Sequence, residues 1–417
     1  MSGSTLACRS CESSALREVL SFGEMPLADR LLTQEMLAQP EPHYPLTVMF
    51  CEHCSLMQIA ETVPPEVLFC EDYPYYSSFS PALLKHSREN ALELIESRSL
   101  NESSLVVELA SNDGYLLKNF VERGVPVLGI DPAEGPAKVA QDAGIDTLCT
   151  FFDSRLARRL REEGRSADVI MGNNVLAHVA NLNGFVEGIG ILLEDDGVGV
   201  IEVPYVVDLI DHCEFDTIYH EHLCYFSVTA LTKLFERHNL HLNDVKRLSI
   251  HGGSLRLFVE HRANPSVTLR SLLDEEAQAG VAEYRYYQDF AERVGRVGDE
   301  LRGLLEELKR GGNSIAAYGA AAKGATLINH VDIGRDLVDF VVDRNVHKHD
   351  KYMPGKHLPI HPCERLLEAQ PDYVLLLAWN FAGEIMQQQA AYIEKGGQFI
   401  VPVPIPRIVA RTTETLA

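Results

Sequence analysis

The segment Val106–Gly114, VVELASNDG, joins an apolar run to a turn of small and polar residues. The run predicts a buried strand, and the glycine predicts a sharp turn into the helical pattern that follows. Later segments, VPVLGI at 125–130, DVIMGN at 168–173 and GVGVIEV at 197–203, repeat this arrangement. Strands that alternate with helices predict a parallel sheet whose ligand site lies at the carboxyl ends of the strands.

Acidic side chains around this turn indicate the charge of its ligand. Glu108 and Asp113 lie in the segment, and Asp131 follows about 17 positions after Gly114, near the spacing of a ribose-binding acid. The turn lacks a full G-x-G-x-x-G pattern, and its acids would repel the pyrophosphate of a dinucleotide. A cofactor with a sulfonium and an amino group suits it better, which favours S-adenosylmethionine over NAD. The alternative is a strand-to-helix turn with no cofactor, as any α/β protein contains.

Further cofactor candidates follow the ends of neighbouring strands. Phe151 and Phe152 stand where the third strand should end, a position suited to enclosing adenine. The expected cofactor-binding set is Glu108, Ala110, Asn112, Asp113, Gly114, Asp131, Phe152, Asp153, Asn173 and Asn174. These residues gather at strand ends, where parallel sheets bind their ligands.

Four of the nine cysteines form two Cys-x-x-Cys pairs, Cys8 with Cys11 and Cys51 with Cys54. The spacing lets both sulfurs of each turn face one ion, so the two turns predict a closed tetrahedral zinc site. Four cysteine ligands leave no open position, and the role of such a zinc should be structural. The alternatives are a redox pair or unrelated free thiols.

Composition restricts the partners of the chain. The 417 residues include 37 basic and 60 acidic side chains, and the net charge of −23 disfavours nucleic acid and anionic membrane surfaces. No run approaches about 18 apolar residues, and the N-terminus has no basic start followed by an apolar run. The odd number of cysteines argues against a secreted disulfide framework. We expect a cytoplasmic, monomeric protein.

The fold class is α/β, and the chain divides into three predicted domains. Residues 1–75 carry the cysteine pairs, residues 76–265 hold the first strand-helix series, and residues 266–417 hold a helical connector and a second, smaller series. The connector, residues 268–310, has helical periodicity throughout and predicts one long, bent helix. A polar cap and a proline at 80–81 predict the start of an earlier helix.

The segment Phe215–Phe226, FDTIYHEHLCYF, places two histidines on either side of a glutamate, among aromatic residues. A metal site here would need a third ligand, and the pattern is not H-E-x-x-H. Packing alone is a sufficient explanation for His220. In an extended segment His220 and His222 would face one side while Tyr219 and Glu221 face the other, whereas in a loop no such assignment holds.

In chain order, ACRSC, CEHC, DYPYYSS, VELASNDG, NNVLAHV, YHEHLCYF, HGGSLR and YGAAAKGAT resemble the motifs of sugar C-3-methyltransferases. These S-adenosylmethionine-dependent enzymes methylate carbon 3 of a thymidine-diphosphate 4-keto-deoxysugar, as in antibiotic branched sugars. The resemblance spans nearly the whole chain and implies a zinc-binding domain, a class I, Rossmann-like methyltransferase domain and a C-terminal Rossmann-like domain for the nucleotide sugar. It departs at Ala110, where the family usually has glycine, so a methyl group should narrow the approach to the cofactor.

The resemblance also implies the catalytic residues. The positions that match the family set are Tyr75, His178, Tyr219, Glu221 and His222, whereas His220 is at a variable position. Removal of a proton beside a ketone needs a base near neutrality and donors for the enolate oxygen. We expect His222 to take the proton from carbon 3, and Glu221 to stabilise positive charge beside it. His178, with Tyr75 or Tyr219, would donate to the oxygen at carbon 4, and which histidine is the base stays open.

A second strand-turn-helix pattern, IAAYGAAAKGAT at 315–326, offers backbone amides and Lys323 for a diphosphate. Trp379 and Asn380 end a later strand of the same domain and could grip the nucleotide, although Trp379 could equally be core. His251, in HGGSLR, is a further substrate-binding candidate. This second turn also supports a rival interpretation, a nicotinamide-dependent oxidoreductase. Further alternatives are a methyltransferase for another small keto substrate and a non-catalytic zinc-containing binding protein.

Overall fold

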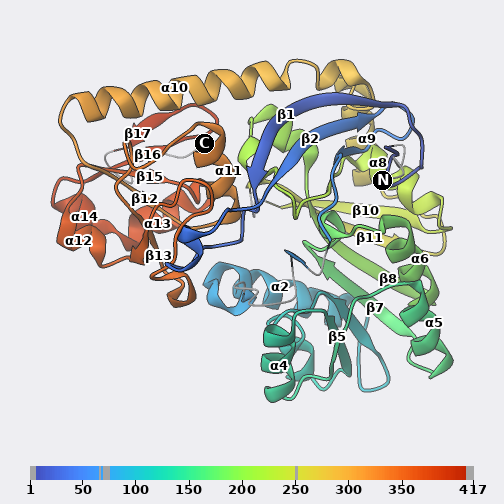
Figure 1. The fold of residues 1–417 in the computed structure, drawn as a ribbon. Helices are drawn as coiled ribbons and strands as arrows, with labels where there is room; N and C mark the ends of the chain where they lie inside the picture. The colour runs from blue at the N-terminus through green and yellow to red at the C-terminus, as the bar shows by residue number, and fades with distance from the viewer. Residues whose placement is uncertain (1–5, 65–66, 69–75, 249–251, 410–417) are drawn as a thin grey trace.

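The computed structural model describes residues 6–64, 67–68, 76–248 and 252–409, which fold around three sheets (Figure 1). The N-terminal sheet has the strand order β1-β2-β3-β9, and all neighbouring strands are antiparallel. Its strands are β1 (Leu16–Pro26), β2 (His43–Cys51), β3 (Met57–Ile59) and β9 (Cys224–Tyr225). Because β9 belongs to the segment 215–226, that segment ends inside the sheet of the N-terminal domain.

The central sheet has seven strands in the order β10-β11-β8-β7-β4-β5-β6. β8, β7, β4, β5 and β6 are parallel, whereas β11 is antiparallel to both β8 and β10. The strands are β4 (Val106–Leu109), β5 (Val127–Asp131), β6 (Thr147–Cys149), β7 (Ala167–Asn173), β8 (Leu193–Pro204), β10 (His241–Leu248) and β11 (Ser254–Glu260). The strand order reverses between β4 and β7, so a ligand is expected at their carboxyl ends.

Helices pack on the central sheet. All four residues of its strand β4 are buried. Burial on both faces explains the continuous apolar pattern of the strand. The helices are α2 (Pro81–Ser97), α3 (Lys118–Val121), α4 (Glu134–Asp142), α5 (Ser154–Glu162), α6 (Leu182–Leu192), α7 (Val206–Asp211) and α8 (Val228–Glu236). The predicted start of α2 is confirmed, since Ser80 Oγ accepts a hydrogen bond from the Leu83 amide and Pro81 is the first helical residue.

The C-terminal sheet has six strands in the order β14-β13-β12-β15-β16-β17, and all pairs except β16 with β17 are parallel. The strands are β12 (Ile315–Tyr318), β13 (Val341–Asp343), β14 (Ile360–Pro362), β15 (Tyr373–Leu376), β16 (Gln398–Val401) and β17 (Arg407–Val409). The helices are α11 (Ala322–His330), α12 (Arg365–Ala369), α13 (Ala382–Gln388) and α14 (Ala390–Glu394). The predicted α/β fold class is therefore confirmed.

The prediction of one continuous connector helix is wrong. The connector consists of α9 (Val267–Ala279), a short 3-10 turn η6 (Tyr284–Tyr286) and α10 (Phe290–Arg310). Gly280, with φ 78°, ends α9 in the left-handed conformation that glycine adopts without strain. In Figure 1 α10 runs along the top of the molecule and reaches both β1 and the C-terminal domain. Across the described ranges, no helix is long and apolar enough to cross a membrane.

Two single-turn helices carry predicted site residues, His178 in η3 (Leu176–His178) and Asn380 in η8 (Trp379–Phe381). Further single-turn helices are η1 (Met36–Ala38), η2 (Ser77–Phe79), η4 (Phe215–Thr217) and η7 (Val346–Lys348). η3 follows β7, and η8 lies after β15, so both stand at the carboxyl ends of parallel strands. The predicted residues Tyr75 and His251 lie outside the described residues.

Candidate active site and metal centre

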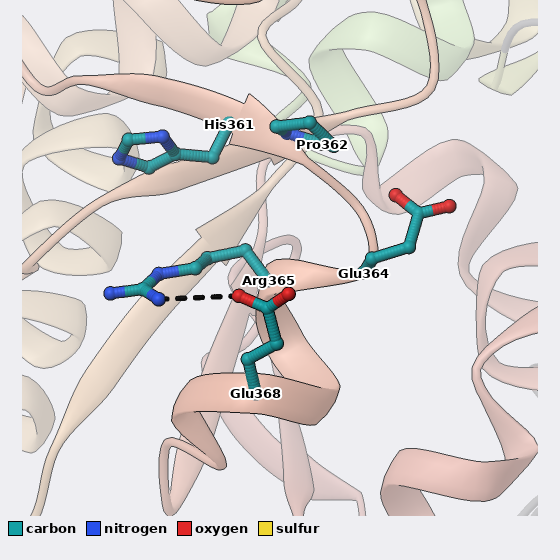
Figure 2. Close-up of a pocket in the computed structure, with 5 residues that line it drawn as sticks. All are labelled: His361, Pro362, Glu364, Arg365 and Glu368. Atoms are coloured by element: carbon teal, nitrogen blue, oxygen red, sulfur yellow. Dashed lines mark hydrogen bonds and ion pairs between the residues drawn. The ribbon is translucent and has the colours of Figure 1, made fainter.

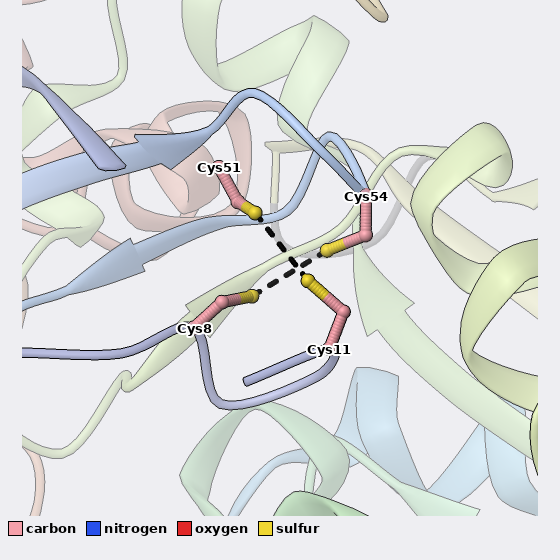
Figure 3. A group of neighbouring side chains, drawn as sticks. All are labelled: Cys8, Cys11, Cys51 and Cys54. Atoms are coloured by element: carbon pink, nitrogen blue, oxygen red, sulfur yellow. Dashed lines mark hydrogen bonds between the residues drawn. The ribbon is translucent and has the colours of Figure 1, made fainter. Parts of the chain in front are cut away.

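The four paired cysteines converge on one point (Figure 3). All ligand atoms of Cys8, Cys11, Cys51 and Cys54 lie within 4.8 Å of one another. Cys8 Sγ lies 3.4 Å from Cys54 Sγ, and Cys11 Sγ lies 3.6 Å from Cys51 Sγ. A tetrahedral zinc with Zn–S distances of about 2.3 Å places its sulfurs roughly 3.8 Å apart, so the cluster fits zinc.

Each Cys-x-x-Cys turn has the same local backbone. The amide of Glu12 donates to the Cys8 carbonyl at 2.9 Å, and the amide of Ser55 donates to the Cys51 carbonyl at 2.9 Å. Glu12 and Ser55 adopt φ values of 61° and 68°, which bring the chain back over the sulfurs. The repeated turn leads from Cys54 directly into β3, so the metal centre adjoins the strand that pairs with β9.

Polar atoms at the carboxyl edge of the central sheet are buried with no hydrogen-bond partner among the described residues. They are Glu108 Oε2, Ser111 Oγ, Asp113 Oδ1 and both side-chain polar atoms of Asn173. Glu108 lies near the end of β4 and Asn173 ends β7, where the strand order reverses. Burial, and then the charges of Asp131 and Asp113, raise the pKa of Glu108 well above its usual value. A ligand with positive charge and hydrogen-bond donors fits these atoms, as S-adenosylmethionine does, and a pyrophosphate does not.

The backbone of the first turn is left-handed at Ala110 (φ 57°), Asn112 (φ 49°) and Gly114 (φ 76°). Such a conformation costs a residue with a Cβ atom about 1–2 kcal/mol, which gives a conformational reason for the glycine usual at position 110. Asp131 holds the turn to β5, because its Oδ2 accepts from the Asn112 amide and its Oδ1 accepts from the Ala133 amide, both at 2.8 Å. A carboxylate has about four acceptor sites, so two remain for ribose hydroxyls.

The other predicted cofactor residues have contacts within the protein. Phe152 packs edge-to-face on Phe185 of α6, with 5.3 Å between ring centres. Asp153 caps α5, because its Oδ1 accepts from the amides of Arg155 and Leu156, and this capping lowers its pKa. The amide of Asn174 donates to the Glu202 carbonyl at 2.8 Å. Their roles toward a cofactor stay predictions.

The contacts of His222 indicate which of its two ring nitrogens carries the proton. Its Nδ1 lies 2.7 Å from the Thr217 carbonyl oxygen, and its Nε2 lies 2.9 Å from the Tyr219 hydroxyl. A carbonyl only accepts, so Nδ1 carries the proton and Nε2 presents a lone pair toward Tyr219. The ring of His178 stands 4.7 Å away, and burial lowers its pKa to about 4. His178 is therefore neutral at pH 7 and able to donate.

Between η4 and β9, the part of the segment that carries the two histidines is a loop and not an extended strand. The His222 amide donates to the Tyr219 carbonyl at 2.9 Å, which closes a tight turn. The alternation of side chains expected for an extended segment therefore does not apply. His220 is fully buried, and its Nε2 lies 3.1 Å from the Pro45 carbonyl of β2. His220 thus packs on the N-terminal sheet, and the metal interpretation of this loop has no support, since the cysteine cluster is the one metal-ligand group found in the described ranges.

Glu221 is buried between domains. Burial, and then the charge of Asp29 in the loop after β1, raise the pKa of Glu221 to about 8. Its Oε2 has no hydrogen-bond partner in the part of the chain that the structure describes. The carboxyl group is therefore mostly protonated at pH 7, which makes it a hydrogen-bond donor and weakens the expected role of stabilising positive charge.

A buried polar group connects the central and C-terminal domains beside this loop. Trp379 Nε1 donates to Asp216 Oδ2 at 2.6 Å, and Lys323 Nζ lies 4.0 Å from Asp216 Oδ1. The same ammonium lies 3.8 Å from the centre of the Trp379 ring and 3.4 Å from Asn380 Oδ1. The structure thus brings Lys323, Trp379 and Asn380 together. Sequence reasoning missed Asp216, and an acid directly after a buried aromatic residue was the available signal.

In the second glycine turn, the backbone groups of Ala320 are hydrogen-bonded to side chains of the protein. The Ala320 amide donates to Asp343 Oδ2 at 2.7 Å, and Lys348 Nζ donates to the Ala320 carbonyl at 2.7 Å. A Cβ atom at Gly319 would lie 2.8 Å from Ala378 Cβ, so the turn packs tightly on the end of β15. An acid in this position disfavours any pyrophosphate at the amides of this turn, of a dinucleotide or of a nucleotide sugar, which argues against the predicted diphosphate site at these amides.

A separate hollow of about 540 Å³ lies at the edge of the C-terminal sheet (Figure 2). It is lined by His361 and Pro362 of β14, by Glu364 directly before α12, and by Arg365 and Glu368 of α12. Arg365 Nη1 and Glu368 Oε2, one turn apart on α12, form an ion pair at 3.3 Å on its wall. None of the predicted site residues lines this hollow, so we do not assign the reaction to it.

Comparison with known families divides the chain into three matched regions. Residues 8–69 match a putative zinc-binding domain, residues 83–245 match a methyltransferase domain, and residues 249–404 match a C-methyltransferase C-terminal domain. The four cysteines therefore form the zinc site, and the acid-lined edge of the central sheet belongs to the methyltransferase domain. These matches contradict the interpretations as an oxidoreductase and as a non-catalytic binding protein.

A full-length relative supports the same assignment. The chain is 37% identical to the C-methyltransferase NovU of Streptomyces niveus over 408 residues, covering 97% of this chain and 96% of the relative. A ubiquinone biosynthesis O-methyltransferase of Bartonella quintana shares 26% identity over 98 residues, 23% of this chain and 40% of that protein. A solved S-adenosylmethionine-dependent methyltransferase of Clostridium acetobutylicum aligns over 44% of this chain and 92% of its own, with 13% identity and a TM-score of 0.36. From the family matches and the full-length relative, this chain belongs to the S-adenosylmethionine-dependent C-methyltransferases with an N-terminal zinc-binding domain.

Proposed function

We propose that this C-methyltransferase adds a methyl group to carbon 3 of a thymidine-diphosphate 4-keto-deoxysugar, through an enolate, in the biosynthesis of a branched sugar. The product would enter an antibiotic or a cell-surface glycan. The sugar is suggested by the ordered motifs that resemble the sugar C-3-methyltransferases. The observation that carries the chemistry is the Tyr219–His222–Thr217 arrangement, which leaves His222 with a basic nitrogen next to a hydroxyl donor.

His222 is proposed as the base that removes the proton from carbon 3. A neutral imidazole with its proton on Nδ1 accepts a second proton at Nε2, and the Thr217 carbonyl then stabilises the imidazolium. His178, neutral at pH 7, would donate to the developing negative charge at the carbon 4 oxygen. Tyr219, and Tyr75 by family resemblance, would supply further donors, with Glu221 as a neutral donor in the same site.

S-adenosylmethionine supplies the electrophilic methyl group when it is bound. We propose that Glu108 and Asp113 face its positive charge, which would offset the raised pKa of Glu108 and favour its carboxylate, and that Asp131 accepts from its ribose. Ala110, Asn112, Gly114, Phe152, Asp153, Asn173 and Asn174 complete the proposed cofactor site. These residues come from strand ends and turns of the central sheet, so the cofactor would lie at the carboxyl end of β4.

The remaining parts of the proposal concern the substrate and the setting. Lys323, Asn380 and His251 are proposed to bind the nucleotide sugar, and the domains are proposed to divide at residues 75 and 265. The enzyme is proposed to act in the cytoplasm, because a four-thiolate zinc site is stable in a reducing compartment. It is also proposed to act as a monomer.

A methyl-transfer assay against a panel of thymidine-diphosphate 4-ketosugars tests this function. Mass spectrometry should detect one added methyl group, and fragment analysis should place it at carbon 3. In deuterium oxide without a methyl donor, the wild-type enzyme should exchange the carbon 3 proton, and the His222→Gln variant should not. Methylation of an unrelated ketone with no reaction on the panel would refute the sugar assignment. Full exchange by the variant would refute the role of His222.

A further inference from the structure

The end of η4 is held by side chains of the C-terminal domain. Trp379 Nε1 donates to Asp216 Oδ2 at 2.6 Å, and the Lys323 ammonium lies 4.0 Å from Asp216 Oδ1. Two residues later, the Ile218 carbonyl accepts a hydrogen bond from Thr326 Oγ1 at 3.1 Å. Lys323 and Thr326 both belong to α11, which packs directly on η4.

Thr217 lies between these two anchored residues. Its carbonyl oxygen is 2.7 Å from His222 Nδ1. Because a carbonyl accepts only, this contact keeps the ring proton on Nδ1 and leaves a lone pair at Nε2, which faces the Tyr219 hydroxyl at 2.9 Å. If the carbonyl moved away, the proton could occupy either nitrogen, and a neutral ring protonated at Nε2 is no base at that atom.

We propose that Trp379, Lys323 and Thr326, here called the η4 anchor, position the catalytic base. The anchor holds the Thr217 carbonyl in place and thereby keeps the proton of His222 on Nδ1. This inference rests on the proposed role of His222. It gives the C-terminal domain a part in the chemical step, in addition to any part in binding the nucleotide.

The chemistry of the anchor explains how it restricts η4. Asp216 is fully buried, and a buried carboxylate needs a compensating charge and hydrogen-bond donors. Lys323 supplies the charge, and Trp379 supplies both a donor to the carboxylate and a ring face for the ammonium. Displacement of η4 would separate these groups, so the loop has few alternative positions.

Two variants remove single contacts of the anchor. Trp379→Phe removes the indole N–H but keeps an aromatic ring beside Lys323, and Thr326→Val removes the hydroxyl but keeps the side-chain shape. The matched control is Tyr352→Phe. Tyr352 donates to Gln34 Oε1 at 2.5 Å, at a different contact between the C-terminal and N-terminal domains.

Nitrogen-15 spectra of histidine-labelled enzyme report the tautomers of its 16 histidines, and the His222→Gln variant identifies the signal of interest. Wild type and Tyr352→Phe should show His222 protonated at Nδ1, whereas the two anchor variants should show a mixture of tautomers. Small displacements of a catalytic group cost up to about 100-fold, so kcat should fall about 10- to 100-fold. Affinity for S-adenosylmethionine, measured by calorimetry, should not change.

An unaltered Nδ1–H signal in both anchor variants would overturn the inference, even if kcat fell, because loss of turnover alone could follow from general loosening. A changed tautomer with wild-type kcat would overturn it as well. The spectra need no sugar substrate, so they test the η4 anchor separately from the proposed function. Failure of the proposed function would instead appear as a wild-type enzyme that methylates none of the panel sugars.

Discussion

Replacing Glu221 with glutamine should stabilise the enzyme in alkaline solution. Burial, and then the charge of Asp29, raise the pKa of Glu221 from 4.5 to about 8. The folded protein therefore keeps a proton that the unfolded chain releases above about pH 4.5, and the free energy of unfolding falls as the pH rises from there through about 8. Each pKa unit is worth about 1.4 kcal/mol, so Glu221 should contribute a loss of roughly 2–3 kcal/mol to the wild type between pH 6 and pH 9. Glutamine carries no proton to lose.

Urea unfolding of wild type and Glu221→Gln at pH 6, 7.5 and 9 measures this effect. The difference between the two proteins reports the titration of Glu221 together with its coupling to Asp29, because the other titrating groups are common to both. Glu96→Gln, on an exposed position of α2, is the matched control and should follow the wild type at each pH. Parallel curves for wild type and Glu221→Gln would show that this carboxyl is already ionised at pH 6, and the neutral-donor role would be refuted.

Three further changes probe the turn, the metal centre and the base. Ala110→Gly should raise the free energy of unfolding by about 1 kcal/mol, measured by thermal unfolding, because glycine adopts the left-handed turn without strain. Removal of zinc with a chelator should lower the unfolding temperature and increase deuterium exchange at 223–225, because Cys54 leads into the strand that pairs with β9. Tyr219→Phe should lower kcat about 100-fold, measured on the substrate found in the panel, because the hydroxyl beside His222 that is proposed to donate to the carbon 4 oxygen is lost.

Each of these predictions has a result that contradicts it. A less stable Ala110→Gly protein would mean that the alanine methyl group contributes packing that exceeds its backbone strain. Equal deuterium exchange at 223–225 with and without zinc would show that zinc binding does not stabilise this loop. A Tyr219→Phe enzyme with normal kcat but a raised KM would assign the hydroxyl to substrate binding and not to the chemical step.

The sequence predicted the elements of the fold well where one periodicity dominates. The apolar run VVEL is buried on both faces of the central sheet, and its burial follows from its composition. The connector was predicted less well, because helical periodicity continues on both sides of Gly280, and only its left-handed backbone separates α9 from α10. A single glycine does not determine from sequence alone whether a helix continues or ends.

The candidate site was predictable in its residue types but not in its contacts. Spacing alone indicated the zinc ligands, since both cysteine pairs are local in sequence. The loop 215–226 was ambiguous, because its conformation depends on partners more than a hundred positions away, such as Trp379 for Asp216 and Pro45 for His220. Contacts of that range arise from the packing of domains, and local pattern carries no signal for them.

These long-range contacts explain why the three domains belong to one enzyme. On one side, the loop of His222 continues into β9, which pairs with β3 beside the zinc cluster. On the other side, Asp216 and Ile218 are held by Trp379 and α11 of the C-terminal domain. The central sheet supplies the acidic edge proposed for the cofactor, and the central domain also contacts the loop of the proposed base, since the Leu223 amide donates to the Ala177 carbonyl at 2.7 Å. Contacts from all three domains therefore position the loop that carries the proposed base.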